Sequence, residues 1–476
     1  MSFLVYDLVL LGIFVLVLGI FLYRKRKEVK RDGLLLLHKT KWGVNLIHKL
    51  GNRHERGLKV LGYFSIALGY ILMAGMIYLV GKIVWVYVLN PGGVVQQIKV
   101  PPITPLIPYL PQIFKLNLPP FYFTYWILII AIVAITHEFA HGIFAARNKV
   151  RIKSTGFGFF PFFLPIFLAA FVELDEKKMG KKKISDQLAI LSAGTFANTL
   201  TAILFVIVMI LFFSFAFAPS GVIFNSYSYT SIGISSIIAV NNITINNPSY
   251  QSILNSMNET GLNEIKAYSG EYLASRSFIA SQNSTAGELI LYSDAPAIRA
   301  DLESTILEIN GKQITSTDEL AKEVYKYSPG TKITLTVIGT DNAPYDRDIV
   351  LGQNPQNKSL PFLGIAFYPK QVPGLFSSIY TNLFSLNRNH VYYASKIGDA
   401  GIFIYHLFWW LIVICISVAL INMLPVGMFD GGKFFYLTVL AITGKESIAK
   451  KAFKFTTYFF LFLLFVVMFF WFVYTR

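Results

Sequence analysis

The chain has 476 residues, too many for one ordinary domain, and 54% of them are hydrophobic. A mean hydropathy of +0.54 argues against a purely soluble protein, because several stretches exceed the roughly 18 apolar residues that a membrane-spanning helix needs. The formal net charge of +16 does not indicate a nucleic-acid-binding protein, since no stacking motif accompanies the basic residues.

Six apolar stretches predict six membrane-spanning helices. Between residues 24 and 59 there are twelve Lys or Arg residues and three acids, and nine further Lys or Arg residues lie between 147 and 183. Basic clusters beside apolar spans mark the cytoplasmic side of a membrane. The N-terminus is therefore expected outside, as the end of a retained anchor helix. The predicted spans are residues 2–23, 60–90, 121–146, 187–217, 402–424 and 455–474.

Two apolar segments do not fit this count of spans. Residues 154–172 contain Gly156, Gly158, Pro161 and Pro165, which suit a helix poorly. We predict a re-entrant, partly extended segment, and such backbone survives at membrane depth only where protein covers it or it lines a wet cavity. Residues 34–50 are compatible with an interfacial amphipathic helix or with an ordinary cytoplasmic packing element.

The composition becomes polar between about residues 219 and 372, which predicts an external domain. Four N-glycosylation acceptor patterns begin at Asn242, Asn258, Asn283 and Asn357, all within this part. The only cysteine is Cys415, so this domain must fold without an intrachain disulfide.

Residues 295–351 have a recognisable order of elements. An apolar stretch around Ile306 precedes a turn at Asn310-Gly311, a helix is expected over 316–327, and an alternating strand begins at Lys332. This order resembles a PDZ domain of the kind attached to membrane proteases, and such domains bind extended peptide at a sheet edge. An unspecialised α/β external domain is the alternative, and the pattern assigns no role to residues 221–290.

The third span contains the motif HEFAH, residues 137–141. Positions i and i+4 share one face of a helix, so His137 and His141 can reach one zinc ion. Glu138 lies beside them and is able to accept a proton from the attacking water. Ionisable residues inside an apolar span predict a functional site. The alternative is a set of polar residues that satisfy one another in a helix bundle.

A third metal ligand is expected near the end of the fifth span, in NMLPVGMFDGG, residues 422–432. Asp430 is a carboxylate at the inner end of an apolar helix, and Pro425 and Gly427 would unwind that helix so that the carboxylate turns towards the metal. The alternative is a helix-terminating Asp-Gly-Gly turn.

Together, these motifs resemble the paired signature of the site-2 protease family of intramembrane metalloproteases. Ser192–Asn198, with the sequence SAGTFAN, is similar to the Gly/Asn motif of that family, although Thr195 stands where a proline commonly follows the glycine. The resemblance also covers the segment FVELDE at 171–176 and the PDZ-like insert.

The resemblance implies His137, His141 and Asp430 as zinc ligands and Glu138 as the general base. It also implies Asn198 and Asn422 as candidates for holding the substrate backbone or the oxyanion. The expected reaction is hydrolysis of peptide bonds in transmembrane substrate helices, in regulated intramembrane proteolysis.

The fold class predicted from these observations is a polytopic α-helical membrane protein of about six spans, with a re-entrant segment and an extracytoplasmic α/β PDZ-like domain. The expected partners are the bilayer, single-span membrane-protein substrates and extended peptide, without nucleic acid. The site is expected towards the cytoplasmic side of the cell membrane. The predicted divisions are the anchor and basic segment (1–58), the membrane region with HEFAH and SAGTFAN (59–218), the PDZ-like domain (219–372) and the C-terminal membrane region (373–476).

Two other functions remain open from the sequence. One is a membrane-bound HExxH protease whose site faces water and whose third ligand is a downstream glutamate. The other is a non-proteolytic scaffold or transporter that retains a zinc site.

Overall fold

In the computed structural model, the chain forms two compact units. The first unit consists of Met1–Phe212 and Ile402–Arg476, and the second of Phe213–Gly401. The structure describes residues 3–32, 35–93, 101, 104, 106–116, 118–159, 168–282, 287–339, 343–368, 385–386 and 388–475.

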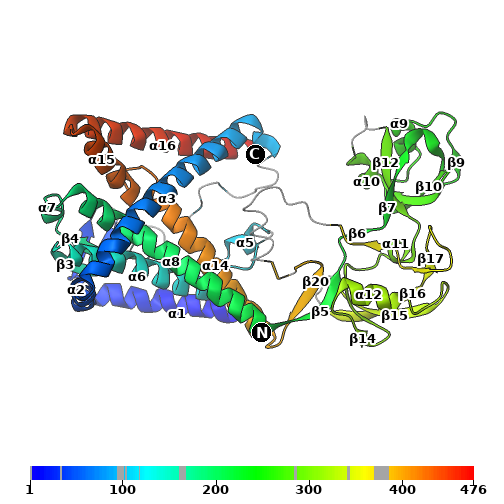
Figure 1. The fold of residues 1–476 in the computed structure, drawn as a ribbon, viewed down its shortest axis with the longest axis horizontal. Coiled ribbons are helices and arrows are strands. Elements are labelled where there is room, and N and C mark those ends of the chain that lie inside the picture. The colour runs from blue at the N-terminus through cyan, green and yellow to red at the C-terminus, as the bar shows by residue number, and fades with distance from the viewer. Residues whose placement is uncertain are drawn as a thin grey trace. The chain divides into compact units, whose positions relative to one another are not determined.

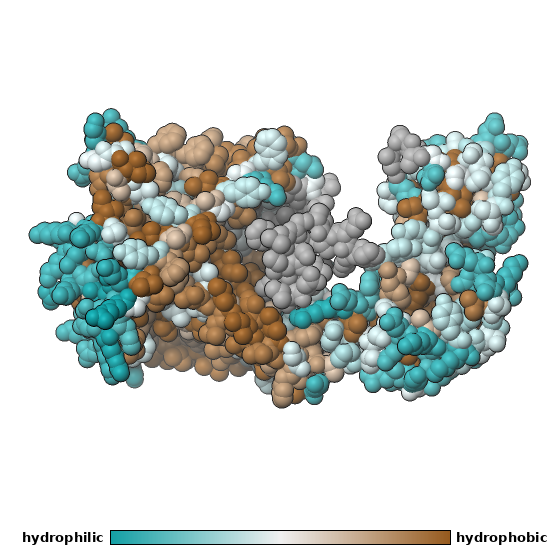
Figure 2. Space-filling view, viewed as in Figure 1, coloured by the Kyte–Doolittle hydropathy of each residue, from teal (hydrophilic) through white to brown (hydrophobic). Residues whose placement is uncertain are grey.

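Within these described ranges, six helices are long and apolar enough to cross a membrane, one at each predicted span (Figure 1). Hydrophobic side chains cover much of the first unit, whereas hydrophilic residues gather at the end near α2 and α7 (Figure 2). This separation matches the positions of the basic clusters in the sequence. The six helices are α1 (Phe3–Arg24), α3 (Glu55–Leu89), α6 (Phe123–Arg147), α8 (Ile184–Ala216), α14 (Asp399–Asn422) and α16 (Glu446–Tyr474).

A four-stranded antiparallel sheet packs beside α6 in the first unit. Its order is β1 (Val29–Asp32), β2 (Leu35–Thr40), β3 (Ile152–Phe159) and β4 (Leu168–Leu174). The partly extended segment predicted over residues 154–172 consists of strands in its described parts; residues 160–167 lie outside the described residues. The re-entrant position of this hairpin stays a prediction.

Of the two interpretations of residues 34–50, the amphipathic helix is wrong in its first half. Leu35–Thr40 forms β2, and helix α2 covers only Val44–Arg53. The reason is pairing with β3, where Gly156 allows the close approach: a Cβ atom there would lie 2.2 Å from the carbonyl oxygen of His38. Pairing with a strand more than 100 residues away in the sequence therefore determines the conformation here, and the local amphipathic pattern does not.

The region around Asp430 differs from the predicted helix end. Helix α14 ends at Asn422, residues 423–429 form a tight turn, and a further helix, α15 (Asp430–Thr443), begins at Asp430. Gly431 and Gly432 lie against this turn, and Cβ atoms there would be 2.4 Å from the backbone of Met423 and Val426. The Asp-Gly-Gly sequence thus starts a helix and does not terminate one.

The N-terminus of α6 is capped by a residue of another helix. Asp7 of α1 is 1% exposed, and its carboxylate accepts hydrogen bonds from the backbone N–H of Phe123 (2.7 Å) and Thr124 (2.9 Å) and from Tyr109 Oη (2.6 Å). The α6 cap residue, Tyr122, offers no side-chain bond. Asp7 therefore satisfies N–H groups that a helix start leaves unpaired. The described part of this unit also contains two short helices, α5 (Leu110–Ile113) and α7 (Glu176–Met179).

The described residues of the second unit form two main antiparallel sheets. The sheet that we name the β8 sheet has the order β7-β12-β11-β10-β8-β9, and the β13 sheet has the order β16-β15-β13-β5-β20, with β14 paired to β13. Two small sheets pair β17 with β18 and β19 with β6. Each main sheet has its own apolar core, around Ile265 in the first and Leu335 in the second.

The predicted order of strand, turn, helix and strand over 306–337 is present as β13, β14, α12 and β15. The strands are β5 (Phe217–Ile223), β6 (Ser226–Tyr227), β7 (Tyr229–Gly233), β8 (Ile237–Val240), β9 (Ile243–Thr244), β10 (Leu262–Ala267), β11 (Gly270–Ser275), β12 (Glu288–Ser293), β13 (Thr305–Ile309), β14 (Lys312–Gln313), β15 (Lys332–Ile338), β16 (Pro344–Val350), β17 (Gly352–Gln353), β18 (Pro361–Phe362), β19 (Ile365–Ala366) and β20 (Val391–Ser395). The helices are the short 3-10 helix η2 (Ile234–Ser236), α9 (Tyr250–Asn255), α10 (Arg276–Ala280), α11 (Pro296–Arg299) and α12 (Thr317–Val324).

Candidate metal centre

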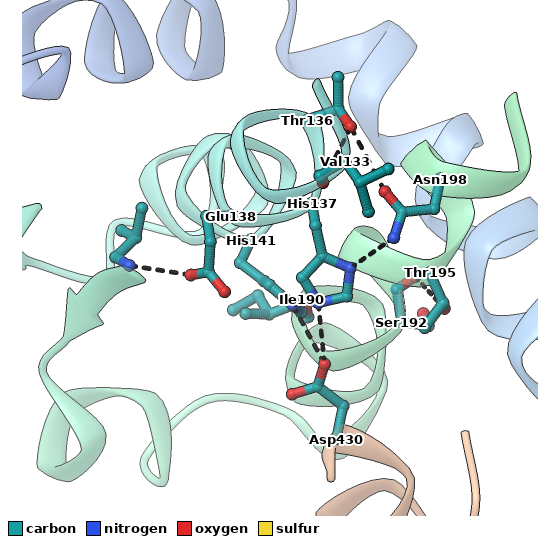
Figure 3. A network of polar contacts seen from close by, with 11 residues as sticks. Val133, Thr136, His137, Glu138, His141, Ile190, Ser192, Thr195, Asn198 and Asp430 are labelled. Atoms are coloured by element: carbon teal, nitrogen blue, oxygen red, sulfur yellow. Dashed lines mark hydrogen bonds and ion pairs between the residues drawn. The ribbon is translucent and has the colours of Figure 1, made fainter. Parts of the chain in front are cut away.

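Three side chains from two helices converge on one point inside the first unit (Figure 3). His137 and His141 lie one turn apart on α6, and their Nε2 atoms are 3.1 Å from each other. Asp430 Oδ2 is 3.4 Å from His137 Nε2 and 3.2 Å from His141 Nε2. The two histidines are 7% and 9% exposed, so most of this polar group is shielded from solvent.

The helix packing around α15 fixes the position of Asp430. Phe434 and Leu437 of α15 are buried with Met423, Met73 of α3 and Leu188 of α8. At the surface, Lys433 pairs with Glu176 of α7 at 2.7 Å, and this contact holds the pKa of the Glu176 carboxyl below its ordinary value. The ion pair is exposed and contributes little stability. The apolar core therefore sets the direction in which Asp430 points.

The outer nitrogen of each histidine has its own partner. His141 Nδ1 lies 2.7 Å from the carbonyl oxygen of Ile190, to which it can only donate. His137 Nδ1 lies 3.1 Å from the side-chain amide of Asn198, whose other amide atom is 3.3 Å from Thr136 Oγ1. A histidine that binds a metal through Nε2 carries its proton on Nδ1, and the Ile190 carbonyl accepts that proton from His141. At His137 the Asn198 amide nitrogen faces Nδ1, so metal binding requires the amide to be turned over, with its oxygen on the ring and its NH2 group on Thr136 Oγ1. With the protons so placed, both Nε2 lone pairs are directed at the same point.

The donor set fits a zinc ion. Tetrahedral zinc with bonds of about 2.0–2.1 Å to nitrogen holds its donors roughly 3.3 Å apart, and the three separations here are 3.1, 3.2 and 3.4 Å. Two histidines and one carboxylate leave a fourth position open, as catalytic zinc sites require. Without a cation, the Nε2 lone pairs would face each other and a carboxylate oxygen at short range.

Gly194 of α8 provides the space beside this point. A Cβ atom there would lie 2.4 Å from His141 Nε2 and 2.6 Å from His137 Nε2. Any other residue would displace a donor or fill the space between them. The SAGTFAN motif thus contributes both this glycine and Asn198 to the same site.

Glu138 faces the sheet next to the metal point. Its Oε2 accepts a hydrogen bond of 2.8 Å from the backbone N–H of Val172 on β4. A narrow pocket on this side of Glu138 lies between α6 and strands β2 to β4 and is lined by Thr40, Trp42, Ile135, Glu138, Phe139, Thr155, Gly156, Phe157, Ala170, Phe171 and Val172. The Glu138 carboxylate therefore lies between the point where the three ligand atoms meet and this pocket, which β4, the edge strand of the sheet, bounds on one side.

The two predicted asparagines have different surroundings. Asn198 is fully buried behind the His137 ring, on the side away from the metal point. This position favours orientation of the histidine, while the predicted contact with substrate or oxyanion stays untested. Asn422 ends α14 and is half-buried, and within the described residues its side chain makes no hydrogen bond to the three ligands.

Several contacts in this site are not foreseeable from the sequence. The carbonyl of Ile190 and the N–H of Val172 are backbone groups, which no residue pattern marks. Gly194 lies within the recognised SAGTFAN motif and Thr136 directly precedes HEFAH, but only the packing of α8 against α6 gives them their contacts.

Two comparisons with known proteins bear on the identity of the chain. The family model described as Peptidase family M50 matches residues 125–467, which include both motifs. A protein of Methanocaldococcus jannaschii described as uncharacterized is 33% identical over 190 residues, which are 38% of this chain and 46% of that protein. The chain therefore spans less than half of the length of this curated relative. With the six apolar helices of its described part it is an integral membrane protein, and it belongs to peptidase family M50.

Proposed function

We propose that this protein is an intramembrane zinc metalloprotease that hydrolyses peptide bonds in single-span transmembrane substrates. The observation that carries the proposal is the convergence of His137, His141 and Asp430 within 4.8 Å of one another, beside Glu138. The M50 match over both motifs supports it independently. Because Asp430 supplies the third ligand, the alternative in which a downstream glutamate binds the metal is not needed.

Each residue of the site has a role in this reaction. His137, His141 and Asp430 would hold the zinc ion, which when bound polarises the scissile carbonyl and makes water a better nucleophile. Glu138 accepts the proton of the attacking water at its carboxylate and later passes it to the leaving amine. Asn198 and Ile190 hold the two rings in place.

A helical substrate must unwind before cleavage, and β4 offers a place for the unwound segment. In antiparallel pairing, alternate residues turn their N–H and C=O groups to opposite sides of a strand. The Val172 N–H points to Glu138, so the N–H of Ala170, two residues earlier on β4, faces the same edge. A substrate strand paired with Ala170 would run past Glu138.

We also propose the arrangement of the chain in the membrane. The basic residues between 24 and 59 and between 147 and 183 support a cytoplasmic position for the nearby metal site. The near-neutral residues 219–372 would then lie outside the cell membrane. The order β13, β14, α12 and β15 supports a PDZ-like domain there, which would take part in regulated intramembrane proteolysis by binding extended peptide.

The first experiment measures zinc and cleavage together. Detergent-purified wild type should contain about one zinc per chain and cleave a candidate single-span substrate. Glu138→Gln should retain zinc and lose cleavage, whereas Asp430→Ala should lose zinc. Cleavage that persists in Glu138→Gln, or a wild type that holds no zinc after purification, would refute the assignment.

The second experiment tests the edge of β4. Ala170→Pro removes the N–H that faces the open edge and leaves the bonds to β3, since proline is tolerated at such positions. Ala170→Val is the matched control because it keeps the N–H. We expect roughly a tenfold or greater loss of cleavage in the proline variant alone, with zinc content unchanged in both. Equal activities would exclude strand addition at this edge. Gly156→Ala is a poorer probe, because its Cβ atom would collide with β2.

A further inference from the structure

The β8 sheet and the β13 sheet repeat the same succession of elements. In each, a strand is followed by a two-residue turn, a short return strand, a helix capped by a serine and a two-stranded hairpin. The caps are equivalent, since Ser249 accepts a bond from the N–H of Ser252 and Ser316 accepts one from the N–H of Glu319. The matching series are β8, β9, α9, β10, β11 and β13, β14, α12, β15, β16.

The pairing registers also agree. Val240 faces Ile265 in one sheet, and Ile309 faces Leu335 in the other. Both strand pairs then slip by one residue at the same place, because Ile238 and Leu307 have no partner across the ladder. A β-bulge is a specific feature, and its recurrence at one position does not follow from general sheet geometry.

The turns carry the same side-chain bonds. Asn241 donates its N–H to Glu264 O (2.9 Å) and accepts from Glu264 N–H at its Oδ1 (3.0 Å). Asn310 makes the same two bonds with Thr334, at 2.7 and 2.8 Å. Both asparagines have left-handed backbone angles, with φ of 51° and 49°. The two sheets are therefore copies of one module.

The copies differ at both edges: β11 pairs with β12, whereas its counterpart β16 ends the β13 sheet, and the second difference lies beside β8. In the β13 sheet, β5 pairs with the first half of β13, Val222 opposite Ile306. The position on β8 that corresponds to Ile306 is Ile237, and no described strand pairs with β8 there: the strand before it, β7, pairs with β12 at the other end of the sheet. Tyr268 donates its N–H to Ser236 O on the β10 side, and the N–H of Ile237 closes the 3-10 turn onto Ile234 O. Alternation therefore leaves the C=O of Ile237 as the acceptor that faces the open edge, where a backbone N–H of an added strand can donate to it.

The open edge lacks the usual protection. The sequence Ile234–Ile238 contains no charged residue and no proline, whereas edge strands of soluble domains are normally guarded by such residues. Ile238 is 36% exposed, and Ile243, on the adjoining β9, is 57% exposed. The sister copy indicates what this edge accepts: an antiparallel strand such as β5, whose Val222 is fully buried.

We propose that the edge of β8 at Ser236–Ile238 is a binding site for an extended segment of another polypeptide, which adds antiparallel to β8 as β5 adds to β13. Resting on the proposed function, we identify this polypeptide as the external part of a membrane-protein substrate. The ligand is an apolar, β-branched-rich stretch without charge, because it must cover Ile238 and Ile243. The site is separate from the metal centre and from the predicted peptide edge of the β13 sheet.

The test uses the strand of the sister copy as the probe. A fluorescent peptide with the sequence of residues 219–226, PSGVIFNS, is titrated into full-length Glu138→Gln protein in detergent. Its matched control carries an N-methyl group on the valine, which removes one backbone donor and keeps the side chains. We expect the control to bind about tenfold more weakly or less, and hydrogen exchange at residues 236–238 to slow when the unmodified peptide binds.

Two variants locate the site. Ile238→Lys places a charge on the open edge and should weaken binding several-fold, whereas Ile290→Lys on β12, also exposed, should leave binding unchanged. Equal binding of both peptides, or slowed exchange only outside residues 236–238, would overturn the proposal. The binding measurement needs no hydrolysis. If the protein proved not to be a protease, peptide binding at β8 could still be measured, and if no peptide bound, the protease assignment would be unaffected.

Discussion

The substitution Gly194→Ala tests the metal centre from a position that is not itself a ligand. The added Cβ atom would lie 2.4 Å from His141 Nε2 and 2.6 Å from His137 Nε2. A favourable non-bonded separation is roughly 3.5 Å, so at least one ring must retreat by about 1 Å. Metal–ligand distances tolerate changes of only about 0.2 Å, and one donor is therefore lost or misdirected.

The size of the effect follows from this displacement. Changes that merely disturb the support of a ligand cost about 10–100-fold in metal affinity. A group inserted between two ligands should lie at the upper end, on the order of 100-fold, which equals about 2.7 kcal/mol. Overall folding should change less, because alanine is favoured over glycine in a helix.

Zinc retention is the assay. Purified protein is equilibrated with graded zinc buffers, and bound metal is measured beside the helix content. Gly75→Ala in α3 is the matched control, since its Cβ atom meets only Leu420 Cδ2 at 3.8 Å, an ordinary contact. If Gly194→Ala bound zinc as tightly as the wild type and this control do, the placement of the ion beside the two histidines would be refuted.

Three further predictions concern the support of the site and the second unit. Asn198→Ala should weaken zinc binding roughly tenfold or more, because His137 loses its orienting partner; the same equilibration checks this, and unchanged affinity would count against an orienting role. Asp7→Ala should lower the free energy of unfolding by about 2–4 kcal/mol, because buried N–H groups of α6 lose their acceptor; chemical denaturation in detergent measures it, and a loss below about 0.5 kcal/mol would contradict the cap. Glu323 pairs with Lys312 and Lys326, which hold the pKa of its carboxyl below the ordinary value, so the stabilisation is present above about pH 4.3 and disappears as the pH falls through the folded-state pKa. Thermal melts at pH 7 and pH 3.5 should therefore differ less for Glu323→Gln than for wild type, and equal differences would disprove the contribution.

Local patterns predicted the parts of the structure that depend on one segment alone. Apolar length located the six long helices found among the described residues, and the i, i+4 spacing placed His137 and His141 on one face of α6. The turn at Asn310-Gly311 separated β13 from β14 as expected. In each case, a periodicity or a turn residue determines the conformation with little help from distant contacts.

Features that depend on distant partners were missed. Leu35–Thr40 is a strand because it pairs with β3, and no residue pattern within Leu35–Thr40 indicates this pairing. Asp430 begins a helix because glycines at 431 and 432 pack on the preceding turn.

The repeated module was obscured for a different reason. Its first copy has Asn241-Asn242 where the second has Asn310-Gly311, and it carries a polar residue, Asn263, in its core, satisfied by Asn241, Asn258 and Ala274. These exchanges keep the hydrogen bonds while they remove the apolar alternation on which a sequence pattern depends.

The contact between Asp7 and α6 imposes an order on biogenesis. The first helix leaves the ribosome with a carboxyl group whose backbone partners, Phe123 and Thr124, are synthesised 116 and 117 residues later. Until they arrive, the group has to remain near the headgroups, since an unpaired acid within the bilayer is costly. Tyr109 is synthesised before them and donates to the same carboxylate. Docking of α6 onto α1 then completes the set of partners, and this contact needs no part of the later segment that carries Asp430.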